Sequence, residues 1–194
     1  FLLSQFVTRY FDENTLTTLS VMFEGLEMTV IFGGIWQAAE PLINIYRAEE
    51  NGVPYALVAA PLGASAATQL LDWLMSYGVR TTIAVGSCGV LCDLPENAFL
   101  IPTRALRDEG TSFHYLPPSR YVETDATLRR TIKNVFASRS LPFVECTTWT
   151  TDGFFRETEA KVRARRAEGC TTVEMECAAL AAPVKEIHQG RQKV

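Results

Sequence analysis

The sequence lacks an apolar run long enough to cross a membrane, since Arg9 and Asp12 soon interrupt the stretch that begins at Phe1. No basic leader or cleavage site precedes that stretch, so we expect no signal peptide. A basic excess is also missing: 18 Lys and Arg residues against 22 Asp and Glu residues give a net charge of −4. This balance argues against a nucleic-acid partner. We therefore expect a cytoplasmic protein that binds neither membranes nor nucleic acid.

Cysteine is scarce and odd in number, with residues at Cys88, Cys92, Cys146, Cys170 and Cys177. The odd count and the apolar neighbours predict reduced thiols, as in cytosolic proteins. Cys88 and Cys92 stand apart from other metal-ligating residue types, so we expect no metal site. The hydrophobic fraction of 47% is enough for one well-cored domain, which we expect to span residues 1–194.

Local patterns predict alternating helices and strands. Asn51-Gly52 is a turn signal that predicts a hairpin. The predicted helices are Ser4–Thr18, Ala64–Tyr77, Asp125–Ser138, Glu157–Glu168 and a helix from Glu176, which Pro183 should end early. The predicted strands are Glu27–Ile31, Ile43–Arg47, Tyr55–Ala60, Thr81–Val85, Phe99–Pro102, Val144–Thr148 and Thr171–Met175, with a turn at Gly33-Gly34.

This order predicts an α/β fold: a three-layer α/β/α domain around a central mixed sheet. Ligands of such sheets gather at the carboxyl ends of the strands. Three chemically dense segments follow predicted strands, namely Gly86–Gly89, Thr150–Phe155 and Glu174–Glu176. Their shared placement is a stronger indication of a site than any one of them.

The segment Val173–Leu180 holds two glutamates two residues apart, directly before a small apolar run. A buried carboxylate is costly unless donors hydrogen-bond to it, and an ionised Glu only accepts. Such acceptors suit a ligand rich in hydroxyl groups, such as a sugar. The alternative interpretation is two acids at a helix N-terminus, which the helix dipole favours.

Two further segments carry candidate chemistry. Gly86-Ser87-Cys88-Gly89 can leave backbone N–H groups free for an anion, although a plain glycine turn explains it equally well. Thr150–Phe155 places an acid and two aromatic rings together, and either ring could stack on a planar base or belong to the core. The loop Arg107–Pro118 contains His114, one of only two histidines.

Together these segments resemble the nucleoside phosphorylase superfamily of purine nucleoside phosphorylases, uridine phosphorylases and nucleosidases. The resemblance rests on Ala84–Gly89, Arg107–Pro118, Thr150–Phe155 and Val173–Glu176 in this order, and it covers roughly Tyr46–Ala182. It implies cleavage of a nucleoside N-glycosidic bond by phosphorolysis, giving a free base and a pentose 1-phosphate. It implies nucleoside and phosphate as partners, with phosphate as co-substrate, no cofactor, and a homo-oligomer built from dimers.

The resemblance also implies roles for single residues. Glu176 is expected to bind the ribose hydroxyls, and Met175 to pack under the sugar. Glu174 and Val173 are expected to line the junction between sugar and base, and Phe154 to stack against the base.

Other roles concern the phosphate and the 5′ side of the sugar. Gly86 and Ser87 are expected to face the phosphate or another nucleophile, and His114 to approach the sugar's 5′ side. The purine enzymes and nucleosidases place a base-protonating Asp after the glutamate pair, but residues 183–194 contain none. Either residues are missing from the chain or the acid comes from elsewhere, with Asp152 as the nearby candidate.

The sequence departs from the phosphorylase pattern where phosphate should bind. Phosphorylases of this kind carry an arginine two residues before the first glycine of the turn, and Ala84 stands here. An early glycine-aspartate-x-x-arginine loop is missing before Gly52 as well. Because arginine is the bidentate partner of phosphate, a nucleosidase that uses water is a serious alternative, and a non-catalytic nucleoside-binding or storage relative is a third. The positions Arg156–Ala160 do not show the arrangement of glutamine and arginine with which uridine phosphorylases select their base, so uracil specificity is not supported.

Overall fold

The computed structural model describes residues 45–50, 52–95 and 98–188. The predicted helix Ser4–Thr18, strand Glu27–Ile31 and turn Gly33-Gly34 lie outside the described residues. The chain forms two compact units. In the described ranges, unit 1 comprises residues 45–62 and 69–87, and unit 2 comprises residues 63–68 and 88–188.

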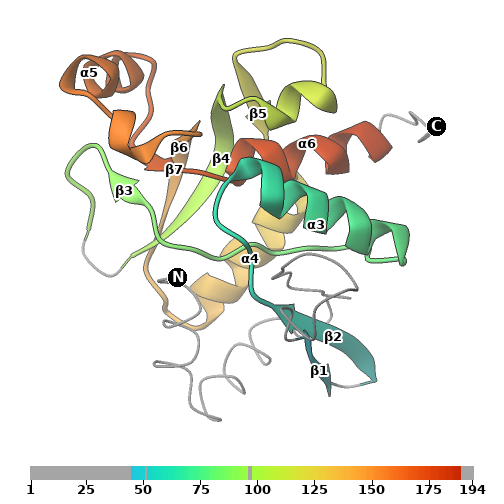
Figure 1. Cartoon of the computed structure of the whole chain (residues 1–194). Helices are drawn as coiled ribbons and strands as arrows, with labels where there is room; N and C mark the ends of the chain where they lie inside the picture. The colour runs from blue at the N-terminus through green and yellow to red at the C-terminus, as the bar shows by residue number, and fades with distance from the viewer. Residues whose placement is uncertain (1–44, 51, 96–97, 189–194) are drawn as a thin grey trace. The chain divides into compact units, whose positions relative to one another are not determined.

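Unit 1 contains the predicted hairpin. Strands β1 (Ile45–Glu50) and β2 (Val53–Val58) pair antiparallel, with Glu50 opposite Val53 (Figure 1). Gly52 has a φ of +78°, the left-handed conformation that this turn requires. Helix α3 (Ala64–Ser76) begins in unit 2 and continues in unit 1. It ends before Gly78, whose φ of +95° suits a residue that follows a helix.

One predicted strand of unit 1 is wrong. Thr81–Val85 is irregular apart from a single bridge residue at Thr82, and the side chain of Val85 is 53% exposed. A short apolar run becomes a strand only when a neighbouring strand supplies hydrogen bonds along its length. The turn Gly86–Gly89 therefore does not follow a strand of the sheet.

Unit 2 is built on a five-stranded sheet whose order is β3-β7-β6-β4-β5. Its strands are β3 (Gly89–Val90), β4 (Phe99–Asp108), β5 (Tyr121–Glu123), β6 (Phe143–Thr151) and β7 (Thr172–Glu174). The three central strands run parallel, whereas β3 and β5 pair antiparallel at the two edges. The predicted mixed sheet is confirmed, although β4 and β6 are longer than expected and β3 and β5 were not predicted.

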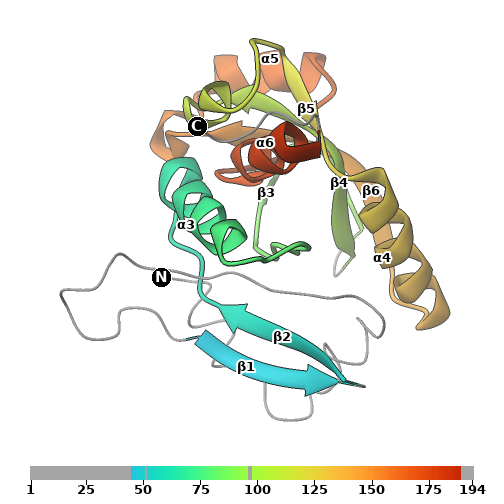
Figure 2. The same ribbon diagram turned by 90° about the vertical axis from the view of Figure 1, so that its right-hand side faces the viewer.

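The remaining elements of unit 2 are three α-helices and two short 3₁₀ helices. They are α4 (Ala126–Ser138), α5 (Glu159–Ala167), α6 (Cys177–His188), η1 (Thr111–His114) and η2 (Phe154–Arg156). Asp125 caps α4 by accepting a hydrogen bond from the Leu128 N–H at 2.7 Å. Phe136 of α4 packs against Phe99 of β4, with ring centroids 4.7 Å apart. Figure 2 shows α4 next to β4.

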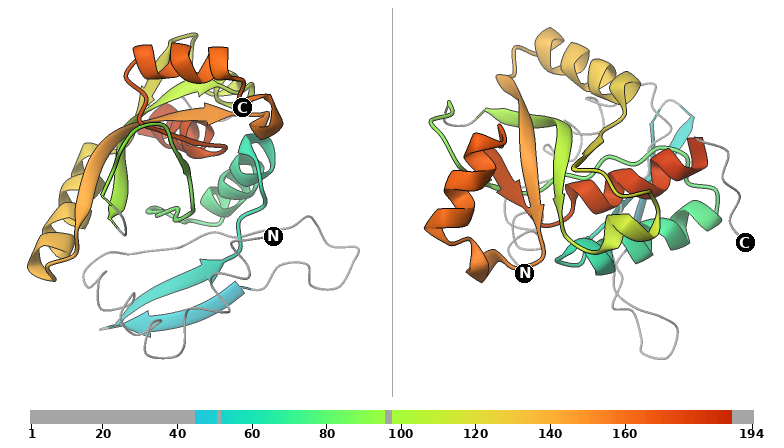
Figure 3. Two further views of the ribbon diagram at one scale, coloured as in Figure 1. Left: turned by 90° about the vertical axis from the view of Figure 1, so that its left-hand side faces the viewer. Right: turned by 90° about the horizontal axis from the view of Figure 1, so that it is seen from above.

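Helices cover both faces of this sheet. The neighbouring residues Ala105 and Leu106 on β4 point to opposite faces, because side chains alternate along a strand. Ala105 packs in one core cluster with Ala178 and Ala182 of α6. Leu106 packs in the other with Trp149, Cys170 and Val173, and Val162 of α5 lies against it. Figure 3 shows α5 and α6 on opposite sides of the sheet. Unit 2 is thus a helix–sheet–helix arrangement, which confirms the predicted three layers.

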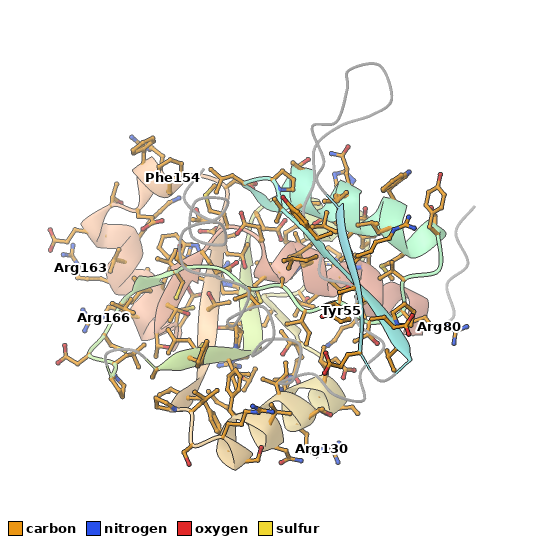
Figure 4. All side chains as sticks on the ribbon, turned by 90° about the horizontal axis from the view of Figure 1, so that it is seen from below. Tyr55, Arg80, Arg130, Phe154, Arg163 and Arg166 are labelled. Carbon is orange, nitrogen blue, oxygen red and sulfur yellow. The ribbon has the colours of Figure 1, made fainter. Side chains whose placement is uncertain are left out.

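Helix α5 carries several basic residues, and most of them face solvent. Arg163 and Arg166 are exposed and point away from the sheet (Figure 4), and Arg163 forms an ion pair with Glu159. Arg165 differs, because its Nη2 lies 3.1 Å from Asp108 Oδ2 and its Nη1 bonds Glu168. This residue ties α5 to the end of β4.

The predicted break at Pro183 is wrong. Helix α6 continues to His188, and Pro183 lies inside it and is fully buried. Proline removes one backbone donor from a helix and strains the preceding turn. Burial of the alanine face formed by Ala178, Ala179 and Ala182 offsets that cost, so packing overrides the local preference.

The five cysteines are free thiols. Burial raises the pKa of Cys146 and of Cys170 to about 11, so both thiols stay protonated at neutral pH. Each helix in the described ranges is too short or too polar to cross a membrane.

Candidate functional site

The carboxyl ends of β4, β6 and β7 meet at one edge of the sheet. In the parallel register Asp108 lies opposite Thr151, and Thr150 lies opposite Glu174. The segments that follow these strands are therefore neighbours. This placement confirms the prediction for Thr150–Phe155 and Glu174–Glu176.

Glu174 ends β7 with both carboxylate oxygens bonded to the protein. Its Oε1 accepts from Thr150 Oγ1 at 2.6 Å and from Thr148 Oγ1 at 3.2 Å. Its Oε2 accepts from the backbone N–H groups of Glu176 at 2.7 Å and Cys177 at 2.6 Å. Burial raises the pKa of Glu174, and the hydrogen bonds oppose that rise.

Thr148 was not predicted as part of the site, and Thr150 was named only as the first residue of the candidate segment Thr150–Phe155, without a role of its own. Both side chains are buried on the face of β6 that meets Glu174. Thr150 Oγ1 also accepts from the Ala178 N–H at 2.9 Å. The signal was present in the sequence, because Thr148 and Thr150 are two residues apart in a strand and so share one face. A buried face of two hydroxyl groups needs a polar partner, and Glu174 supplies it.

Glu176 follows β7 and carries the second carboxylate. Its Oε1 accepts a hydrogen bond from the Gly63 N–H at 2.6 Å. Burial raises the pKa of Glu176, while the backbone N–H groups of Gly63 and Met175 lower it. A carboxylate has about four acceptor positions, so the two backbone donors leave acceptor capacity for a ligand.

Gly63 holds Glu176 from the residue just before α3. Its φ of +96° is a conformation that favours glycine. Its N–H donates to Glu176, and its carbonyl accepts from the Ala67 N–H at 3.1 Å as the helix begins. The carboxylate of Glu176 thus lies at the N-terminal end of a helix, where the helix dipole favours negative charge.

Asp152 ties two of the strand ends together. It is exposed at the end of β6, and its Oδ2 accepts from the Gly110 N–H at 2.9 Å. Gly110 belongs to the loop that follows β4. The hydrogen bond to Gly110 therefore connects the segment after β6 to the loop after β4, and the Asp152 side chain remains in contact with solvent.

The loop Arg107–Pro118 is organised around a buried arginine. Arg107 is only 2% exposed, and it donates to Ser112 Oγ, Pro117 O, Ser119 Oγ and Leu116 O at 2.7–3.2 Å. Its Cζ lies 3.9 Å from the centroid of the Phe113 ring. Desolvation lowers the pKa of Arg107, and the nearby Glu109 carboxylate opposes this change. His114 ends η1 and is exposed beside this network.

Phe154 and Phe155 lie on η2, directly after Asp152 and Gly153 (Figure 4). Their ring centroids are 4.0 Å apart, and the residues are 45% and 87% exposed. Neither ring belongs to the core, so both are open to contact with a planar ligand.

The amino-acid sequence matches a known protein family. A family model described as the phosphorylase superfamily matches residues 36–183. The chain belongs to the phosphorylase superfamily. Among curated protein sequences, none matches this chain.

Structural comparison agrees with this membership. A solved structure of a Helicobacter pylori MTAN mutant, with 5′-methylthioadenosine in its active site, superimposes with a TM-score of 0.67. The identity is 16%, and the match covers 84% of this chain and 81% of that one. At this identity the likeness shows the phosphorylase-like α/β fold.

In this member of the phosphorylase superfamily, the residues expected around the sugar lie along the same edge of unit 2. Val173 is buried in β7, and Met175 is partly buried between the two glutamates. Glu174 is the last residue of β7, Glu176 follows that strand, and Asp152 follows the neighbouring strand β6. The roles assigned to these residues stay predictions.

The glycine turn is divided between the two units. Gly86 and Ser87 are exposed in unit 1, and their role at phosphate stays a prediction. Gly89 belongs to unit 2, where it pairs with Val173. A Cβ atom at Gly89 would lie 2.8 Å from Val173 Cγ1, so close strand packing explains this glycine.

The described ranges 45–50, 52–95 and 98–188 contain no group of three His, Cys, Asp or Glu side chains arranged to hold a metal ion. The residues at the strand edge supply carboxylates, hydroxyl groups, backbone donors and aromatic rings.

Proposed function

We propose that this chain cleaves the N-glycosidic bond of a nucleoside by phosphorolysis, releasing a free base and a pentose 1-phosphate. The observation that carries the proposal is the Glu176 carboxylate, which the Gly63 N–H holds at the edge where β6 and β7 end. Membership of the phosphorylase superfamily supports the same reaction class. The nucleoside bound in the similar MTAN structure supports this class of ligand.

The proposed chemistry begins with the sugar. Glu176 accepts hydrogen bonds from the ribose hydroxyls and lies in a favourable position for the positive charge that develops on the ring. Glycosidic cleavage passes through such an oxocarbenium-like state. An oxygen of phosphate then forms a bond to the anomeric carbon from the face opposite the base.

The bond between the anomeric carbon and the base nitrogen breaks, and its electron pair goes to the base. A proton delivered to the base completes its departure, and we assign Asp152 as the candidate general acid. Phe154 stacks against the base, Met175 packs under the sugar, and Val173 lines the junction between them. His114 approaches the 5′ side of the sugar.

Gly86 and Ser87 are the proposed phosphate contacts. Backbone N–H groups of a glycine turn and a serine hydroxyl can both donate to phosphate oxygens. Phosphate serves as co-substrate, and no cofactor takes part. The proposed assembly is a homo-oligomer built from dimers, which light scattering at micromolar concentration would test; a monomer would contradict it.

Hydrolysis is the second candidate, and Ala84 favours it. Arginine is the bidentate partner of phosphate, and the position two residues before Gly86 holds alanine instead. In that reaction, water takes the place of phosphate and the products are the free base and the free sugar.

The deciding experiment is release of free base from a panel of purine and pyrimidine nucleosides, with and without phosphate. Release only with phosphate supports the proposal, and release without it establishes the hydrolytic candidate. Glu176→Gln tests the site, with Glu123→Gln on the exposed edge of β5 as the control. Binding without release in either condition would favour a non-catalytic relative and contradict both reactions.

A further inference from the structure

We propose that Glu174 is a positioning residue that builds the start of α6 and thereby sets Glu176, without itself touching the nucleoside. The role in catalysis rests on the proposed function. The structural part stands on the contacts of Glu174 alone, so the two can fail separately.

The first argument is that the acceptor capacity of Glu174 is filled. An ionised carboxylate has about four positions for hydrogen-bond donors. Thr148 and Thr150 occupy one oxygen, and the N–H groups of Glu176 and Cys177 occupy the other. A ribose hydroxyl could bond to this carboxylate only by displacing one of these donors.

The second argument concerns the first turn of α6. The first N–H groups of a helix have no partner within it. Here Glu174 accepts from Glu176 and Cys177, and Thr150 Oγ1 accepts from Ala178. Regular helical bonding then begins with the Leu180 N–H donating to Glu176 O at 2.9 Å. One buried carboxylate and one buried hydroxyl thus satisfy three donors in succession.

The third argument links this turn to Glu176. The backbone of Glu176 is held by Glu174, while its side chain is held by Gly63. The two contacts fix the direction in which the Glu176 carboxylate points. Loss of Glu174 would free the backbone end of that arrangement, so its effect on a bound sugar passes through Glu176.

A glutamine at position 174 separates the two roles. Its amide oxygen can still accept from the Glu176 and Cys177 N–H groups, and its NH₂ group can donate to the threonine hydroxyls. A capping role therefore survives Glu174→Gln in large part and is lost in Glu174→Ala. A direct role of the negative charge at the sugar is lost equally in both variants.

Amide hydrogen exchange tests the structural part without any substrate. We expect Glu174→Ala to speed exchange of the Glu176, Cys177 and Ala178 amides at least about tenfold, with α4 amides unchanged. Thr150→Val is expected to act in the same direction at Ala178. Thr147→Val is the matched control, since Thr147 Oγ1 accepts from Arg104 Nε and lies on the other face of β6. Unchanged exchange at α6 in both Glu174→Ala and Thr150→Val overturns the proposal.

Kinetics test the catalytic part. We expect Glu174→Gln to lower kcat/KM less than about tenfold and Glu174→Ala to lower it about a hundredfold. Thr150→Val combined with Glu174→Ala should add little to Glu174→Ala alone, because both act on the same turn. Equal losses in Glu174→Gln and Glu174→Ala, or additive losses in the double variant, would mean that the carboxylate acts on the nucleoside directly.

The outcomes of the two experiments remain distinct. Absence of turnover in the unsubstituted protein refutes the proposed function, and hydrogen exchange still decides the role of Glu174 in α6. If Glu174→Ala fails to fold, Thr150→Val and Glu174→Gln provide the same comparison in milder form.

Discussion

The ends of β6 and β7 lie side by side in the sheet, yet they present their acidic groups in opposite ways. At the end of β7, Glu174 is enclosed by two threonine hydroxyls and two backbone N–H groups. At the end of β6, Asp152 is exposed and accepts a backbone hydrogen bond from the Gly110 N–H. Adjacency in the sheet therefore does not make two carboxylates equivalent.

The difference shows how a carboxylate at a strand end is divided between folding and ligand binding. A carboxylate whose acceptor positions are filled by protein donors stabilises the backbone, because removing it leaves buried donors unpaired. A carboxylate with remaining capacity is available to a ligand. Glu176 combines the two situations, since backbone donors hold it and acceptor positions remain.

The largest expected effect is on activity, at Glu176. Because Gln keeps the shape of Glu but loses its charge, Glu176→Gln should lower kcat/KM by about 100-fold to 1,000-fold. Steady-state kinetics of base release would measure this change. A variant that kept turnover within twofold of the unsubstituted protein would refute the role given to Glu176.

The next effect is on stability and contrasts the two strand ends. Glu174→Ala should lower the free energy of unfolding by about 3 kcal/mol, because it leaves several buried donors without an acceptor. Asp152→Ala should cost about 0.5 kcal/mol, because its site is exposed. Chemical denaturation would compare the two variants. Equal losses in the free energy of unfolding would show that the two carboxylates contribute equally to stability, despite their different surroundings.

Gly89→Ala should disturb the β7 side of the sheet. The added methyl group would lie 2.8 Å from Val173 Cγ1, so the buried Val173 side chain or the β3–β7 pairing must shift. We expect a loss of about 1–3 kcal/mol in the free energy of unfolding. Thermal or chemical unfolding would measure it, with Gly153→Ala as the control, because its nearest neighbours lie at 3.5 Å.

Phe154→Ala probes the exposed end of β6. Loss of the ring should raise KM for a nucleoside about tenfold, as expected for a lost stacking contact, and leave unfolding little changed because the residue is 45% exposed. Phe155→Ala is the paired control. If Phe155→Ala raised KM and Phe154→Ala did not, the ring that stacks on the base would be Phe155 instead of Phe154.

The smallest effect concerns pH. Burial raises the pKa of Glu174 above its ordinary value of 4.5, so its contribution to stability is full below that pH and is lost as pH rises through the folded pKa. Glu174→Gln removes this titration. Its free energy of unfolding relative to the unsubstituted protein should therefore increase over the pH range above 4.5. A constant difference across that range would contradict the raised pKa.

Much of this fold could be predicted from local patterns. The hairpin at Gly52, helices α3 and α4, and the strand–helix alternation of unit 2 follow from turn chemistry, capping and periodicity. Thr81–Val85 and Pro183 were mispredicted because partner strands and buried packing decide them, and neither can be read from a short window.

The candidate site was predicted in part for a similar reason. The order of the segments placed Asp152, Glu174 and Glu176 at strand ends. The sequence does not show which carboxylate has its acceptor positions filled by donors of the protein itself. For Glu174 these donors include Thr148 and Thr150, which are more than twenty residues away in sequence. Arg107 was likewise noted only as part of a dense loop, because its burial becomes visible once the loop closes around it.

The central claim is that Glu176 binds the nucleoside, whereas Glu174 stabilises the start of α6. Thermal stabilisation of the protein by a nucleoside tests this claim most directly. A bound ligand raises the melting temperature, and at a given concentration the rise is larger when the ligand binds the folded state more tightly. We predict that a nucleoside stabilises the unsubstituted protein and Glu174→Gln and has little effect on Glu176→Gln. Stabilisation that is lost in Glu174→Gln but kept in Glu176→Gln would contradict the account.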